Sequence, residues 1–239
     1  MTKALRIAHC SDIHLDGDAP DTDGDYYRDG FARVLSKMRD HNPDMFLIAG
    51  DLFDSNTATD STINWAMNII SKQPVPVVMI PGNHDCLEEG SIYHRYDFNR
   101  VPNLQMLATE TGTIARVEDL GVAVWGKGMV EHAPDYSPLG GCPDRPSDCQ
   151  WFFGMGHGIY VPHGGETHRS SPIHMQEIED SPCDYLALGH HHAALELVNE
   201  KASAAYCGSP TDTIGKGATY IVVDLKQDVA PTVVVHAIS

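Results

Sequence analysis

The stretch MFLIAGDLFDSNTATDSTINWAMNIISKQPVPVVMIPGNHD, residues 45–85, predicts a strand, a helix and a second strand in that order. The runs Met45–Ala49 and Val75–Ile80 are apolar on both faces, which is typical of strands covered on two sides. Between them, apolar residues recur at the spacing of one face of an amphipathic helix: Ile63, Ala66, Met67 and Ile70. We expect Asp60 or Ser61 to cap this helix. A helix that crosses over between two such strands indicates the α/β class.

The same alternation extends along the rest of the chain. A second amphipathic stripe precedes Met45 and consists of Phe31, Val34, Leu35 and Met38. Further β-rich runs are Leu5–Ala8, Val122–Trp125, Trp151–Met155, Tyr185–Leu188, Ala218–Leu225 and Thr232–Ile238. No helical stripe follows residue 202, so we expect the chain to close with antiparallel strands. Residues 131–149 and 161–172 are rich in Pro, Gly and Ser without periodicity and are predicted to be loops. The pattern favours an α/β sandwich.

Length and composition limit the class of protein. The 239 residues, 42% of them hydrophobic, suit one domain spanning 1–239. No apolar run reaches the roughly 20 residues of a membrane-spanning helix, and the opening MTKALRIAH lacks a signal-peptide pattern, so we expect a cytoplasmic protein. The six cysteines form no CxxC pair and are expected to be reduced thiols. Cys142 and Cys149 supply half of a typical zinc site.

The net charge of the chain argues against a duplex nucleic-acid partner. The 33 acidic and 16 basic residues give a formal charge of −17, and the averaged surface therefore repels phosphate backbones. Bound divalent cations would cancel several of these charges locally. We therefore regard duplex DNA as a doubtful partner.

Side chains able to bind metal ions follow five of the predicted strands. They are Asp12 and His14, then Asp51, then Asn83 and His84, then His157, and finally His190 and His192. The carboxyl ends of strands in α/β sheets open onto the crevice where ligands bind, so these residues can converge on one site. Taken singly, each residue is more often a turn, cap or surface group. Five coincidences in order at strand ends favour a metal site.

The types of ligand indicate which metals are expected. Carboxylate, imidazole and amide donors without thiolate favour manganese, iron or zinc over calcium or magnesium. With Asp51 bridging, the donors divide into two sites, and such paired ions lie about 3.5–4 Å apart. Paired ions lower the pKa of a shared water and hold the oxygens of an in-line displacement at phosphorus. The residues thus predict a dimetal phosphoesterase.

The ordered motifs SDIH (11–14), GDLFD (50–54), GNHD (82–85), GH (156–157) and GHHH (189–192) resemble those of the calcineurin-like metallophosphoesterases. The resemblance, from about Leu5 to Asp212, implies a four-layer α/β/β/α sandwich of two mixed sheets. It implies that one metal binds Asp12, His14, Asp51 and His192, and the other Asp51, Asn83, His157 and His190. His84 would contact the leaving-group or transition-state oxygens, Asp85 would set its orientation and charge, and His191 would point away.

Within this family, GDLFD, YLALGHHH (185–192) and YCGSPTD (206–212) are most similar to the SbcD-type DNA-repair exonucleases. Those nucleases continue into a capping region, which we do not expect here. Three hypotheses therefore compete: a hydrolase of small or single-stranded phosphodiesters, or of phosphomonoesters; an SbcD-type exonuclease or endonuclease; and a non-catalytic scaffold of the same fold. Every ligand position carries a donor, which favours an enzyme. His163 and His168 compete with His157 for one position. His94 and His132 are candidates to line the cleft, but we expect both of them and His174 to face solvent.

Overall fold

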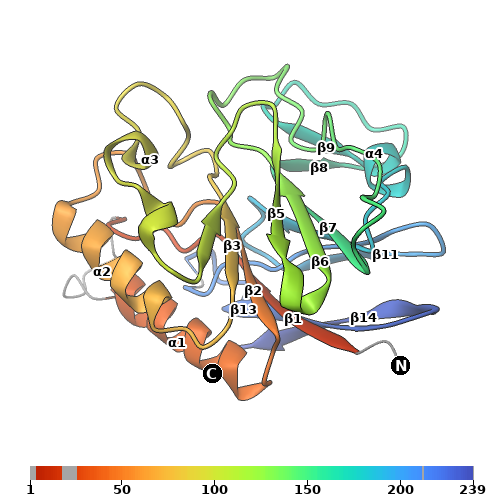
Figure 1. Cartoon of the computed structure of the whole chain (residues 1–239). Helices are drawn as coiled ribbons and strands as arrows, with labels where there is room; N and C mark the ends of the chain where they lie inside the picture. Colours follow the sequence, from red (N-terminus) through yellow and green to blue (C-terminus); the bar gives the residue numbers. More distant parts are fainter. Residues whose placement is uncertain (1–3, 18–25, 212, 239) are drawn as a thin grey trace.

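A computed structural model of the chain describes residues 4–17, 26–211 and 213–238, so Asp212 lies outside the described residues. Two six-stranded sheets pack face to face, and helices lie outside them (Figure 1). The layer between the sheets is mostly apolar and includes Ile7, Leu47 and Phe153, each fully buried. Together the sheets and helices confirm the predicted α/β sandwich of two mixed sheets.

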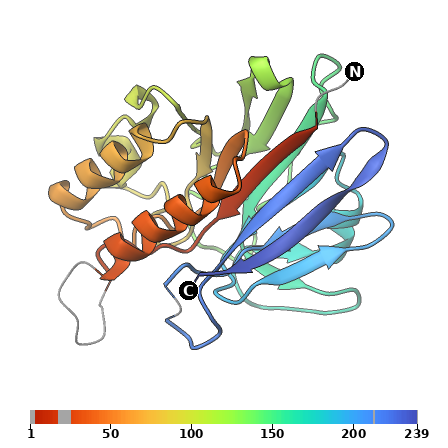
Figure 2. The ribbon, with the colours of Figure 1, turned by 90° about the horizontal axis from the view of Figure 1, so that it is seen from below.

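The first sheet has the order β14-β13-β1-β2-β3-β4. Its strands are β1 (Leu5–Cys10), β2 (Met45–Ala49), β3 (Val77–Ile80), β4 (Leu104–Met106), β13 (Thr219–Lys226) and β14 (Val229–Ala237). The first four run parallel, whereas β13 and β14 form an antiparallel hairpin beside β1 (Figure 2). The antiparallel closure expected for the end of the chain is thereby confirmed.

The second sheet has the order β11-β12-β10-β7-β6-β5. Its strands are β5 (Thr113–Val117), β6 (Val122–Gly126), β7 (Trp151–His157), β10 (Tyr185–Gly189), β11 (Leu195–Val198) and β12 (Ser203–Tyr206). The central four are parallel, and the two edge strands run antiparallel to them. A small separate sheet pairs β8 (Ile159–Val161) with β9 (Pro172–His174).

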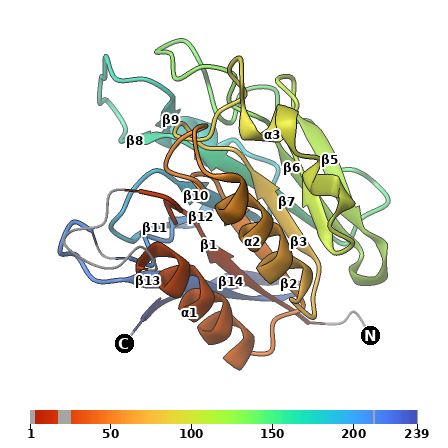
Figure 3. The same cartoon turned by 90° about the vertical axis from the view of Figure 1, so that its left-hand side faces the viewer.

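The two outer layers differ in thickness. Helices α1 (Tyr26–Asp40) and α2 (Asp60–Ser71) cover the first sheet with the apolar faces that the sequence predicts (Figure 3). Over the second sheet lies the short helix α4 (Met175–Glu179), together with β9 and the loop that carries Leu139. The remaining helical segments are α3 (Ile92–Arg95) and the 3₁₀ turns Phe98–Arg100 and Glu118–Leu120. In the described part of the chain, no helix is long and apolar enough to cross a membrane.

Local details differ from the sequence-based expectations. The cap of α2 is Thr59, whose side-chain oxygen accepts from the Thr62 backbone N–H at 3.3 Å, and not Asp60 or Ser61. Thr59 takes this position because the Asp16 carboxylate accepts from its backbone N–H at 2.8 Å. The predicted loop 161–172 contributes its first residue to β8 and its last to β9. Six strands of the described residues were not predicted from the sequence: β4, β5, β8, β9, β11 and β12.

Candidate metal centre

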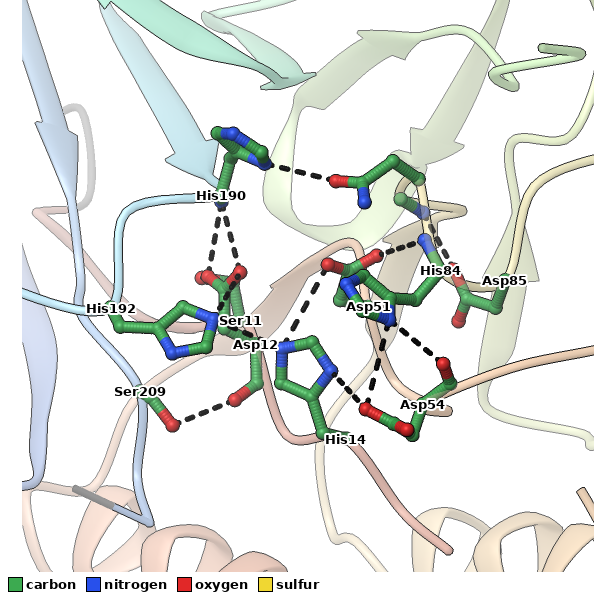
Figure 4. A network of polar contacts seen from close by, with 12 residues as sticks. Ser11, Asp12, His14, Asp51, Asp54, His84, Asp85, His190, His192 and Ser209 are labelled. Atoms are coloured by element: carbon green, nitrogen blue, oxygen red, sulfur yellow. Dashed lines mark hydrogen bonds and ion pairs between the residues drawn. The ribbon is translucent and has the colours of Figure 1, made fainter. Parts of the chain in front are cut away.

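The donor residues predicted from the sequence meet at one end of the sandwich, where five strands finish (Figure 4). β1, β2 and β3 run parallel in the first sheet, and β7 and β10 run parallel in the second. Among the described residues, three sets of side chains have ligand atoms within 4.8 Å of one another: Asp12/His14/His192, His14/Asp51/His84 and Asp12/Asp51/His157. The structure therefore brings together residues that are far apart in the sequence and could hold metal ions.

The first group of donors surrounds two imidazole nitrogens. His14 Nε2 lies 3.1 Å from His192 Nε2. His192 Nε2 is 3.9 Å from Asp12 Oδ1, and His14 Nε2 is 3.9 Å from Asp51 Oδ2. At this distance the two Nε2 atoms can form a hydrogen bond only if one of the rings carries a proton there. A cation between the rings and the carboxylates would instead accept the lone pairs of both nitrogens and of the carboxylate oxygens. The donor set and its geometry fit a metal ion.

The second group lies on the other side of Asp51. His157 Nε2 is 3.1 Å from Asn83 Oδ1 and 3.2 Å from Asp51 Oδ2, and His190 Nδ1 is 2.9 Å from the same Asn83 oxygen. His157 Nδ1 donates to the Ala49 carbonyl at 2.8 Å, so the Nε2 lone pair faces the centre. Asp51 Oδ2 thus has His14 on one side and His157 on the other, as a bridging ligand requires.

The backbone is strained where it presents these donors. Positive φ values occur at four of them: 54° at Asp12, 55° at His14, 52° at Asp51 and 100° at His190. Residues other than glycine seldom adopt this left-handed region. Backbone hydrogen bonds hold this conformation, since Ile13 N donates to Asp51 O at 2.9 Å and Asp12 N to Gly50 O at 3.1 Å. Such clustered strain is characteristic of functional sites. A Cβ at Gly82 would collide with the Asp51 carboxylate, so this position requires glycine.

Burial and charge set the protonation of the centre. Asp12 and Asp51 are at most 1% exposed. Burial lowers the pKa of His14, and it lowers the pKa of His190 to about 3. Burial alone would also lower the pKa of His157, but the Asp51 carboxylate outweighs it and raises the pKa to about 9. The Asp12 and Asp51 carboxylates are therefore buried among imidazoles, an arrangement that attracts cations.

His84 occupies the exposed side of the centre. Its side chain is 42% exposed, while its backbone N–H donates to Asp51 Oδ1 at 2.9 Å. His84 Nδ1 donates to the Asp54 carbonyl at 2.8 Å, and the Asp54 carboxylate lies 3.6 Å from the same nitrogen. The Asp54 carboxylate also contacts His14 Nδ1 at 3.1 Å. Asp54, the last residue of GDLFD, therefore touches both imidazoles, a role that the sequence pattern did not assign.

Asp85, which the family resemblance assigns to setting the orientation and charge of His84, makes its hydrogen bonds to other groups. Its carboxylate accepts from the backbone N–H groups of Gly82 at 2.7 Å and Leu52 at 2.9 Å, from that of Phe53, and from the Tyr93 hydroxyl at 2.6 Å. It is fully buried and ties the segment after β2 to the segment after β3. The residue that contacts the His84 ring is Asp54, because the Asp85 carboxylate is directed inward to these four donors.

The remaining histidines and thiols occupy other places. His163, 57% exposed, contacts Glu179 at 3.2 Å on the surface, and His168 is also exposed, so His157 occupies the centre. His191 accepts from Tyr160 N at 3.3 Å and packs on Tyr206, away from the donor groups. His132 is exposed as expected, yet its ring lies 6.0 Å from that of His190. Cys142 Sγ faces Cys183 Sγ at 3.9 Å instead of Cys149.

Known proteins share this sequence pattern and fold. A protein of Fibrobacter succinogenes named as a probable cyclic nucleotide phosphodiesterase is 31% identical over 110 residues, which cover 41% of this chain and 42% of that protein. The DNA double-strand break repair protein Mre11 of Nanoarchaeum equitans is 33% identical over 85 residues, 33% of this chain and 23% of that protein. This chain thus aligns with less than half the length of these relatives.

A crystal structure from Thermus thermophilus superposes over 99% of this chain and 100% of its own, with a TM-score of 0.65 and 12% identity, which shows the shared fold. The profile of the calcineurin-like phosphoesterases matches residues 5–194, which include every donor residue of the centre. The chain therefore belongs to the calcineurin-like phosphoesterase family.

Proposed function

We propose that this protein is a dimetal-dependent hydrolase of phosphodiester bonds, with Asp51 bridging the two ions. The position of Asp51 carries the proposal, because its Oδ2 atom lies 3.2 Å from His157 Nε2 and 3.9 Å from His14 Nε2. Asp12, His14 and His192 complete one set of donors, and Asn83, His157 and His190 complete the other. Mixed oxygen and nitrogen ligation favours manganese, iron or zinc.

The protein residues around the centre support phosphoryl chemistry. When bound, the ions would supply Lewis-acid polarisation of the phosphoryl group and a water of lowered pKa. His84 is exposed beside this centre, and its Nδ1 proton is committed to the Asp54 carbonyl. Its Nε2 atom is therefore available to a substrate oxygen. When the ring carries both protons, Nε2 can donate a hydrogen bond that stabilises negative charge or act as the acid that protonates the leaving alkoxide.

The proposed substrates are small or single-stranded phosphodiesters. The similarity to a named cyclic nucleotide phosphodiesterase supports a diester, and the net charge of −17 disfavours a long duplex. The similarity to an Mre11 repair protein supports a nuclease of the SbcD type as the second candidate. Both reactions need the same centre, so they differ in the surface around it.

A substrate panel with controlled metal content tests the proposal. The protein is stripped with a chelator, and one portion is reloaded with manganese. Each portion is assayed on an aryl phosphodiester, an aryl phosphomonoester, cyclic nucleotides, single-stranded DNA and duplex DNA. We expect diester hydrolysis only in the reloaded portion. Undiminished hydrolysis by protein that elemental analysis shows to be metal-free would contradict the proposal, and cleavage of duplex DNA at rates matching the single strand would favour the nuclease.

A further inference from the structure

His132 borders the second group of donors, whereas His84 lies beside the first. The His84 ring lies 4.7 Å from the His14 ring, within the first group of donors, whereas the His132 ring lies 6.0 Å from the His190 ring of the second group. His132 belongs to the loop 127–150 between β6 and β7 and is exposed. Two imidazoles that are not among the proposed metal ligands therefore lie beside the centre, one next to each group of donors.

Backbone hydrogen bonds fix the loop segment that carries His132. The Met129 carbonyl accepts from Leu87 N at 2.7 Å, and the Ala133 carbonyl accepts from Ser171 N at 3.1 Å. Met129 is only 1% exposed. The chain is thus fastened on both sides of His132, to the segment after β3 and to the end of the loop 162–171. These bonds hold the backbone around His132 in place beside the centre.

Arg169 lies on the second of these loops, two residues before Ser171, whose backbone N–H donates to the Ala133 carbonyl at 3.1 Å. This bond holds the segment of Arg169 beside the segment of His132, where Arg169 adds a positive charge. Burial lowers the pKa of His132, and the charge of Arg169 acts in the same direction. Some other arginines are paired with carboxylates, such as Arg6 with Asp224 and Arg116 with Asp148. Within the described residues, the Arg169 guanidinium has neither an ion pair nor a hydrogen bond. An unpaired guanidinium beside a phosphoester centre is suited to bind an anion.

We propose that His132 and Arg169 form a second anion subsite, which binds the phosphate that neighbours the scissile diester in a dinucleotide or single-stranded oligonucleotide. This inference rests on the proposed phosphodiesterase function and narrows its substrate class. One guanidinium and one imidazole offer local contacts to a single additional phosphate, whereas a duplex requires a continuous track of cations. A cyclic mononucleotide has no second phosphate and cannot use this subsite.

Calorimetric binding tests the subsite without relying on turnover. Manganese-loaded protein is titrated with thymidine 3′,5′-bisphosphate and with thymidine 5′-monophosphate. We expect the bisphosphate to bind about tenfold more tightly at low salt, with the difference shrinking as salt rises. Arg169→Gln and His132→Gln should each reduce the difference. Arg100→Gln is the matched control, because it removes the same charge from a side chain that is 84% exposed on the Phe98–Arg100 turn. This variant should retain the difference in affinity between the two nucleotides.

Equal affinity of the wild-type protein for the two nucleotides, or a preference that persists in Arg169→Gln, would overturn the subsite. Hydrolysis of the dinucleotides pTpT and TpT and of an aryl diester separates this result from the proposed function. Hydrolysis of the aryl diester without preference for the bisphosphate or for pTpT contradicts the subsite alone. Preferential binding of the bisphosphate by a protein that hydrolyses no diester supports the subsite and contradicts the proposed function.

Discussion

His14 and His192 are separated by 178 positions in the chain, yet their Nε2 atoms lie 3.1 Å apart. β1 and β10 belong to different sheets, and the segments after them converge at the same end of the sandwich. Each ring contacts a further group through Nδ1, since His14 meets Asp54 at 3.1 Å and His192 meets Thr213 at 3.4 Å. Both Nε2 atoms are therefore directed at the position of the proposed metal ion.

Replacement of the bridging carboxylate should remove both metal and activity. We expect wild-type protein loaded with manganese or iron to hold two ions per chain, and Asp51→Asn to hold fewer and to hydrolyse no diester, because Asp51 Oδ2 faces both groups of donors. Elemental analysis and turnover of an aryl diester measure this. A wild-type stoichiometry that stays at one or below after loading would contradict the dinuclear arrangement.

His84→Ala should retain the metals and lose most of the turnover. His84 is assigned to the reacting oxygens, and such acid or electrostatic roles are worth about 10²–10⁴-fold in rate. His163→Ala is the matched control, because His163 lies on the surface against Glu179. Loss of metal from His84→Ala, measured by elemental analysis, would show that this residue is a ligand.

Substitutions of Asp54 and Asp85 should have different effects, one on activity and the other on stability. Asp54→Asn weakens the contacts that orient His14 and His84, and we expect a fall of about 10–100-fold in kcat or metal affinity with little change in folding. Asp85→Asn places an amide against four donors in the interior and should destabilise the fold by about 3 kcal/mol or more. Urea unfolding and kinetics of both variants distinguish the two roles, and a reversed pattern would reject the assignment.

His9 should make the protein less stable in mild acid. It is fully buried, contacts the Tyr185 hydroxyl at 3.1 Å, and burial lowers its pKa to about 3. Its unfolded pKa is about 6.5, so its stability contribution is present above pH 6.5 and falls as pH drops toward 3, by about 1.4 kcal/mol per unit. Urea unfolding measures the free energy of unfolding at pH values of about 7.5 and 5.5. Between these two pH values, we expect this free energy to fall by about 1.4 kcal/mol more in the wild type than in His9→Gln. Equal drops would indicate that His9 does not titrate in this way.

Long duplex DNA should bind poorly. Affinity for duplex depends on Lys and Arg residues that neutralise phosphates, and this chain has 16 of them against 33 acidic residues. We expect an affinity weaker than about micromolar for a duplex oligonucleotide at physiological salt, beside ready hydrolysis of a small aryl diester. Submicromolar duplex binding with a steep salt dependence would support the nuclease instead.

The sequence alone determined the fold class and which side chains are candidate metal ligands, because each depends on local patterns. Apolar runs such as Met45–Ala49 indicate buried strands, and a donor directly after such a run lies at a sheet edge in any α/β arrangement. His157 could be chosen over His163 for this reason. The extent of the domain and the location of the protein in the cell stay predictions.

Tertiary structure alone decided which groups meet across the chain. Short edge strands such as β5 and β11 are only partly buried, so they lack the continuous apolar signal of the central strands. No spacing along the chain shows that Asp54 contacts both His14 and His84, that Asp85 turns inward, or that His132 borders His190. These contacts arise because two separate sheets stack with their ligand-bearing ends together, a relationship that only the packing of the layers specifies.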